Sequence, residues 1–339
     1  MFSMGEYLNR RYRQTERALA FAATNRDEWE VWNRQLSETL NTLMGPWPDR
    51  CPLDTQIVDR VEEEGYLREK VIFRSEPDMA VPAWVLIPGD IKPAERRPAV
   101  LALHGHGHGK DSLIGIAHGE SGRVGNIRSH NYDYARQAAM HGYVVIAPDA
   151  RGFGERRVGY EHPGKDGCDL VLLKAIMLGM NPLSLNVWDA RRCIDYLVTR
   201  PEVDPDRIAC IGLSYGGTLT LFTTIFEPRI KACVISGYLN LWGAFAYELG
   251  NFCGSQIVPD LLRYAEMGDV AALIAPRPAL YECGKQDGTF PIAAAREAYA
   301  TVLRAYEVLG VPDHVELDAF DGGHEWSGRK AWGWLSQWV

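Results

Sequence analysis

The sequence has no closely spaced cysteines, no long apolar run and no excess of basic residues. Even the two cysteines nearest each other in sequence, Cys193 and Cys210, are too far apart for the C-x-x-C spacing of zinc sites. The count of 7 cysteines in 339 residues is odd and shows no repeated spacing. Such usage favours reduced thiols over a disulfide framework, so we expect a cytoplasmic protein.

The lack of long apolar runs argues against a membrane partner, and the charge balance argues against a nucleic-acid partner. No apolar run approaches the roughly 18 residues of a membrane span, and the chain reaches Arg10, Arg11 and Arg13 without the apolar core of a signal peptide. We therefore expect neither export nor a membrane partner. With 36 basic against 44 acidic side chains, the formal charge is -8, which provides no broad basic surface for a nucleic acid.

The first 50 residues are predicted to form an N-terminal helical extension. Apolar side chains, Leu19 and Phe21 among them, recur at helical intervals between residues 6 and 45. The run Met44-Gly45-Pro46-Trp47-Pro48 then ends the pattern, so we predict two helices. They could cap a pocket or pair subunits in a homo-oligomer, and the sequence leaves both alternatives open.

Residues 51–339 are predicted to form one catalytic domain of the α/β class. Segments rich in β-branched residues between 56 and 88 predict a strand meander. Short, almost continuously apolar runs then predict a mostly parallel central sheet flanked by helices. The runs are 98–103, 143–147, 207–211, 230–235, 279–283 and 314–317. A helix is predicted over 184–199 with Ser184 as its cap, and insertions at about 105–130, 152–182 and 238–266 are candidate pocket walls.

The strongest local motif is Gly212-Leu213-Ser214-Tyr215-Gly216, which follows an apolar strand and precedes a helical stretch. This is the G-x-S-x-G nucleophile elbow in its required context, where a tight turn projects the serine hydroxyl above the sheet. Chance could produce the pentapeptide in a chain with 33 glycines, but the flanking strand and helix argue against it. We interpret Ser214 as a nucleophile.

A serine nucleophile needs a histidine base and a carboxylate that orients it, and in this type of hydrolase they follow in the order Ser, Asp or Glu, His. Only His314 and His324 lie downstream. His324 follows two glycines in a loop and is preferred over His314, which lies in a strand-like run. Asp287 follows the apolar run ending at Cys283 and is preferred as the carboxylate. Its rivals, which share the loop of the histidine, are Asp318, Asp321 and Glu325.

The run His104-Gly105-His106-Gly107-His108-Gly109 directly follows the first parallel strand, and its glycines let the backbone approach a substrate. Its amides and that of Tyr215 are candidate oxyanion donors. The run is not a phosphate loop, because His104 and Asp111 occupy positions that require Gly and Ser or Thr. An H-x-H-x-H metal site is the less favoured alternative, and packing of the imidazoles is a third. Asp149 and Arg151, upstream of the serine, are interpreted as structural.

Together these motifs resemble the α/β-hydrolase superfamily over about residues 56–339, with the N-terminal helices outside the common core. Gly105-His106-Gly107 and the run from Pro148 to Arg157 are similar to those of dienelactone-hydrolase-like and acetyl-xylan-esterase-like esterases. Ser214 departs from the cysteine nucleophile of dienelactone hydrolases, so lactone chemistry is not implied. The resemblance implies that His106 supplies the first oxyanion amide.

These residues predict a serine carboxylesterase that acts on a small-molecule ester, such as an acetyl ester of a sugar, without a metal or organic cofactor. A prolyl-oligopeptidase-like serine peptidase is the alternative enzyme, although no length remains for a large gating domain. A noncatalytic binding protein of the same fold is the third possibility, but it would not need all three triad positions. Trp188, Trp242 and Trp326 are candidate pocket aromatics, although residues of this kind more often pack in the core.

Overall fold

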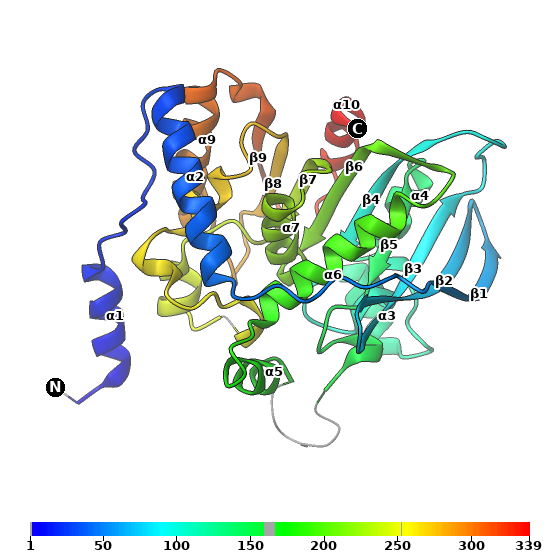
Figure 1. The fold of residues 1–339 in the computed structure, drawn as a ribbon, viewed down its shortest axis with the longest axis horizontal. Coiled ribbons are helices and arrows are strands. Elements are labelled where there is room, and N and C mark those ends of the chain that lie inside the picture. Colours follow the sequence, from blue (N-terminus) through cyan, green and yellow to red (C-terminus); the bar gives the residue numbers. More distant parts are fainter. Residues whose placement is uncertain (1, 159–166, 252) are drawn as a thin grey trace.

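The computed structural model describes residues 2–158, 167–251 and 253–339, which form a nine-stranded sheet with helices on both faces (Figure 1). The strands follow the order β1-β2-β3-β5-β4-β6-β7-β8-β9 across the sheet. Their bounds are β1 (Gln56–Glu63), β2 (Tyr66–Glu76), β3 (Met79–Pro88), β4 (Arg97–Leu103), β5 (Val144–Pro148), β6 (Val203–Leu213), β7 (Ile230–Ser236), β8 (Ala279–Gly284) and β9 (Val315–Phe320).

The pairing of the strands changes once along the sheet, from antiparallel to parallel. β1, β2 and β3 form an antiparallel meander, and β3 pairs antiparallel with β5. From β5 to β9 every pairing is parallel. The predicted meander and the predicted mostly parallel sheet are both confirmed, and each predicted apolar run overlaps a strand.

Buried side chains alternate between two apolar layers along the central strands. In β4, Ala99, Leu101 and Leu103 join the layer on one face, whereas Val100 and Ala102 join the other. The first layer is covered by α2, α6, α7 and α9, and the second by α4 and α10. The helices are α1 (Met4–Gln14), α2 (Arg26–Leu43), α3 (Ser121–Ser129), α4 (Tyr134–Met140), α5 (Gly167–Ile176), α6 (Pro182–Leu197), α7 (Tyr215–Phe226), α8 (Met267–Ala272), α9 (Ile292–Leu309) and α10 (Ala331–Trp338).

The two N-terminal helices are present, and the second belongs to the main core. Leu36 and Leu40 on α2 are fully buried in the same apolar layer as the sheet residues, and α2 lies beside α9 (Figure 1). Leu19 and Phe21 lie in the connection between α1 and α2 rather than in a helix. That connection is held by tertiary contacts, because the amide of Leu19 donates to the carbonyl of Tyr264 at 2.8 Å.

The helix predicted over 184–199 is α6, but its predicted cap is wrong. The helix begins two residues earlier, since Asn181 accepts a hydrogen bond from the amide of Leu183 at 2.8 Å and Pro182 occupies the first turn. Ser184 instead donates to the carbonyl of Met44 at 2.6 Å. Its hydroxyl therefore ties α6 to the end of α2.

The three predicted insertions carry short helical elements of their own. Segment 105–130 contains a 3-10 helix, η1 (Gly109–Ile114), and α3, and segment 152–182 contains α5. Residues 159–166 of the second insertion lie outside the described residues. Segment 238–266 contains three helical turns, η3 (Gly243–Glu248), η4 (Gly254–Gln256) and η5 (Leu261–Arg263). Among the described residues, no helix combines the length and apolar character needed to cross a bilayer.

Candidate active site

Ser214 lies at the junction between β6 and α7, in a backbone conformation that few residues other than glycine adopt. Its φ of 62° and ψ of -122° place it outside the helical and extended regions. The amide of Ser214 donates to the carbonyl of Ser236 at the end of β7, at 2.9 Å. The strained turn is therefore anchored to the neighbouring strand, as expected for a nucleophile elbow.

The elbow requires glycine where the chain passes closest to β4. A Cβ atom on Gly216 would lie 2.0 Å from the carbonyl oxygen of Leu103, and one on Gly212 would lie 2.3 Å from the carbonyl oxygen of Gly216. Backbone atoms cannot move away without breaking the sheet. The flanking glycines are thus needed to bring α7 directly behind Ser214.

His324 and Asp287 form a hydrogen-bonded pair at the same end of the sheet. Nδ1 of His324 lies 2.8 Å from Oδ2 of Asp287. The other carboxylate oxygen, Oδ1, accepts the amides of Thr289 at 2.7 Å and Phe290 at 2.9 Å, and the ring of Phe290 stacks on His324. The Asp287 side chain is 1% exposed and that of His324 is 25% exposed. The Asp287 carboxylate is therefore held in place and shielded from water, whereas the imidazole of His324 is partly exposed to solvent.

Ser214 and the His324–Asp287 pair lie at the carboxyl ends of parallel strands of one sheet. Ser214 follows β6, Asp287 follows β8 and His324 follows β9. Gly237, directly after β7, lies between them, because a Cβ atom there would be 3.2 Å from the His324 ring and 3.0 Å from the side chain of Leu213. Parallel strands present their carboxyl ends at one edge, where ligands bind in this class of sheet.

The loop after β4 lies directly against the elbow. A Cβ atom on Gly105 would lie 3.1 Å from Cβ of Ser214. His104 is buried, and burial lowers the pKa of its ring. Its Nε2 accepts the amide of Ala150 at 3.0 Å, so Nδ1 carries the proton and donates to the carbonyl of Gly105 at 2.7 Å. The neutral imidazole thereby fixes the start of the loop.

Two tyrosines that the sequence analysis did not single out also hold this loop and the elbow. The hydroxyl of Tyr132 accepts the amide of Gly105 at 2.6 Å, and Tyr134 donates to the carbonyl of Leu103 at 2.6 Å. Both rings are buried. They lie just before α4 and at its first residue, where no local motif marks them, which is why sequence reasoning missed them.

Asp149 and Arg151 have the structural role expected for them. Asp149 accepts the backbone amide and the ammonium group of Lys110, at 2.8 and 2.9 Å. Arg151 forms a two-pronged ion pair with Asp189 on α6, at 2.9 and 2.7 Å. Both residues therefore brace the walls around the site.

The rival base and carboxylates are engaged elsewhere. His314 contacts the carbonyl of Pro276 at 2.9 Å through Nδ1. Asp318 pairs with Arg329, Asp321 pairs with Lys285 at 2.8 Å, and Glu325 accepts the amide of Gly323 at 3.2 Å. Within the described residues, Asp287 is thus the carboxylate that contacts His324.

The candidate pocket aromatics are mostly buried among other side chains. Trp188 donates to the carbonyl of Ser75 at 2.8 Å between α6 and β2, and Trp326 is 1% exposed and stacks on Tyr134. Packing in the core accounts for both residues, which corrects their assignment to a pocket. Trp242 lines a cavity of about 350 Å³ beneath α1, together with Tyr12 and others.

A second buried acid supports the loop that carries His324. Glu282 on β8 is fully buried and accepts the amides of Gly328 at 2.9 Å and Ser327 at 3.3 Å. Burial raises the pKa of this carboxyl to about 7. In the sequence, this buried acid could have been recognised as a charged residue within the otherwise apolar run 279–283.

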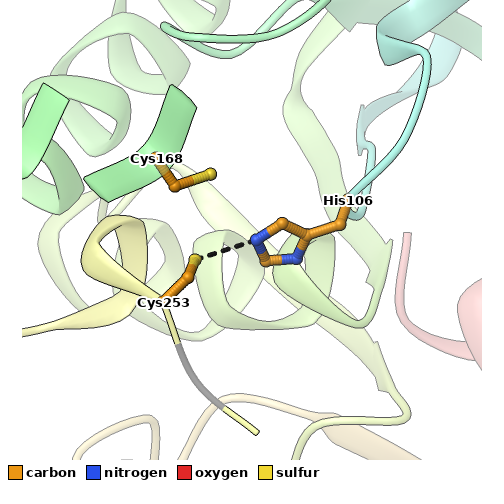
Figure 2. Close-up of side chains that lie close together, drawn as sticks. All are labelled: His106, Cys168 and Cys253. Atoms are coloured by element: carbon orange, nitrogen blue, oxygen red, sulfur yellow. Dashed lines mark hydrogen bonds between the residues drawn. The ribbon is translucent and has the colours of Figure 1, made fainter. Parts of the chain in front are cut away.

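The first two histidines of the H-x-H-x-H run contact different neighbours. His104 faces Ala150, whereas Nε2 of His106 lies 2.9 Å from the sulfur of Cys253. Within the described residues, the grouping of metal-ligand side chains is His106, Cys168 and Cys253 (Figure 2). The cysteines lack the sequence spacing of a zinc site, yet two of them lie close to His106 in space.

Comparison with known proteins gives a family match over most of the chain. The sequence model of the Abhydrolase family matches residues 7–325. The match begins within α1, earlier than the residue 56 expected from the motifs. A Bacillus subtilis protein named as a hydrolase, YtaP, is 27% identical over 298 residues, which cover 83% of this chain and 90% of YtaP.

Solved structures show the same fold at lower identity. A Bacteroides fragilis protein described as an acetyl xylan esterase superposes with a TM-score of 0.80 at 22% identity, covering 94% of this chain and 82% of that one. A glucuronoyl esterase from Solibacter usitatus gives a TM-score of 0.68 at 14% identity, covering 96% and 98% of the two chains. With this sheet topology and this family match, the chain belongs to the Abhydrolase family and has the α/β-hydrolase fold.

Proposed function

We propose that the protein is a serine carboxylesterase that hydrolyses small acyl esters, including acetyl esters of sugars. The hydroxyl of Ser214 attacks the ester carbonyl while Nε2 of His324 takes its proton. The amides of His106 and Tyr215 receive the oxyanion. The tetrahedral intermediate expels the alcohol, which His324 protonates, and water then releases the acid from the acyl-enzyme by the same relay.

The contact between His324 and Asp287 carries the proposal. A hydrogen bond of 2.8 Å from Nδ1 to a carboxylate that two backbone amides hold in place sets the tautomer that a general base needs. Tyr215 is the first residue of α7, so its amide lacks an acceptor within the helix and is available for an oxyanion. These steps use side chains and amides of the chain itself.

The proposed substrate class comes from the fold relatives named above. These relatives are named as an acetyl xylan esterase and a glucuronoyl esterase, and this chain has their fold. A panel of p-nitrophenyl acetate, butyrate and octanoate, with acetylated sugars alongside, measures acyl length and leaving group. Faster cleavage of a peptide anilide than of the acetyl ester would instead favour the peptidase alternative.

The test of the nucleophile compares Ser214→Ala with Ser336→Ala. Ser336 is exposed on α10 and serves as the matched control. We expect Ser214→Ala to lower kcat/KM for p-nitrophenyl acetate by about 10⁴-fold or more, with Ser336→Ala close to wild type. A fluorophosphonate probe should label the wild type and the control but not Ser214→Ala. Near-native turnover by folded Ser214→Ala would overturn the assignment.

A further inference from the structure

Three soft metal-ligand side chains from separate parts of the chain meet beside the elbow. His106 lies in the loop after β4, Cys168 on α5, and Cys253 just before η4 (Figure 2). One ligand atom from each, the two sulfurs and a ring nitrogen, lies within 4.8 Å of the others. The ring of His106 is 5.2 Å from that of Tyr215, which directly follows Ser214.

The sulfur of Cys253 has a polar neighbour besides His106. The hydroxyl of Ser255 lies 2.8 Å from this sulfur. A hydroxyl that donates to a thiolate is the kind of outer contact that orients metal ligands.

The distances are close to those of a tetrahedral zinc site. Bonds of about 2.3 Å to sulfur and about 2.0 Å to nitrogen place the ligand atoms of one zinc ion about 3.5 to 3.8 Å apart. His106 Nε2 and the Cys253 sulfur are now 2.9 Å apart, and all three ligand atoms lie within 4.8 Å. Shifts of about 1 Å in side chains would complete the geometry, which is within the range of rotamer adjustment.

We propose that His106, Cys168 and Cys253 form a binding site for one zinc ion. Two thiolates and one imidazole select zinc over magnesium or calcium, which prefer oxygen ligands. The exposed edge of His106 and the partial exposure of Cys253 leave an entry path and a fourth position for water. The ion would tie two insertions, at α5 and at residue 253, to the loop that carries the His106 amide.

The same two sulfurs could instead form a disulfide on oxidation, and the experiment separates the two outcomes. The full chain is reduced with a phosphine, stripped of metal and titrated with Zn²⁺ against a colorimetric zinc chelator. Cobalt is used as a second probe, because cobalt bound to thiolates gives an intense charge-transfer band in the near ultraviolet. The variants are Cys168→Ser, Cys253→Ser and His106→Gln, with Cys51→Ser as the matched control.

We expect the wild type and Cys51→Ser to bind one zinc ion per chain and to give the cobalt band. Each ligand variant should bind zinc at least about tenfold more weakly, with circular dichroism to check folding. Ser214→Ala should bind zinc like the wild type, so this result does not depend on the proposed esterase activity. Equal affinity in wild type and ligand variants would overturn the proposal. So would a Cys168–Cys253 disulfide in the untreated protein combined with no zinc binding after reduction.

Discussion

At the scale of single residues, Asp287 is placed to act through His324 alone. One of its oxygens is occupied by two backbone amides, and the other faces the imidazole. Asp287→Asn would keep the shape but replace the charged acceptor with an amide group, which disfavours the tautomer that has its proton on Nδ1. We expect kcat for p-nitrophenyl acetate to fall by about 10² to 10⁴-fold with KM little changed.

Asp321→Asn is the matched control for that prediction. Asp321 lies in the loop of His324 but pairs with Lys285 at the surface, and its side chain is 80% exposed. Stopped-flow and steady-state rates of the two variants should therefore differ strongly. A larger loss in Asp321→Asn than in Asp287→Asn would show that the orienting carboxylate has been misassigned.

At the scale of elements, Glu282 joins β8 to the loop after β9. Its carboxyl accepts two amides of that loop, and its own carbonyl accepts the amide of Gly237 at 2.8 Å. The folded pKa of about 7 is above the ordinary value of 4.5. Between those values the unfolded chain loses the proton while the folded chain keeps it. The free energy of unfolding should therefore fall as pH rises across this window, by up to about 3 kcal/mol.

Glu282→Gln keeps the shape and one of the two acceptor oxygens but cannot ionise, so it should remove this part of the pH dependence. Urea unfolding of wild type and variant at intervals from pH 4.5 to 7.5 gives the difference between the two curves. Glu62→Gln, exposed on β1, is the control and should follow the wild type. A difference curve that stays flat over this range would contradict the buried-acid assignment.

At the scale of the whole molecule, α2 and the sheet share one core. Leu36→Ala would leave a cavity in that core and should lower the free energy of unfolding by about 2 to 5 kcal/mol. Val31→Ala on the same helix changes a side chain that is 44% exposed and should cost less than about 0.5 kcal/mol. Tryptophan fluorescence and circular dichroism should report one common transition. Separate transitions would show that α2 folds independently of the sheet.

The sequence was most informative where a pattern is local. The apolar runs predicted every strand of the parallel sheet, and the elbow predicted the turn at Ser214. The N-cap of α6 was misplaced because Ser184 and Asn181 are both good caps and only Asn181 precedes the proline at the helix start. The meeting of His106 with Cys168 and Cys253 was not predictable, since it arises from tertiary packing of two insertions.

β1 is an edge strand of the sheet, and its outer side affects whether the protein aggregates at high concentration. A strand with one unpaired side can add a strand from another molecule. Here the edge strand carries charges of both signs, at Asp59, Arg60, Glu62 and Glu63, and its register shifts between Ile57 and Asp59. Charge and irregular geometry both oppose such strand addition. Edge-to-edge aggregation through β1 is therefore disfavoured, although the sheet is large and open.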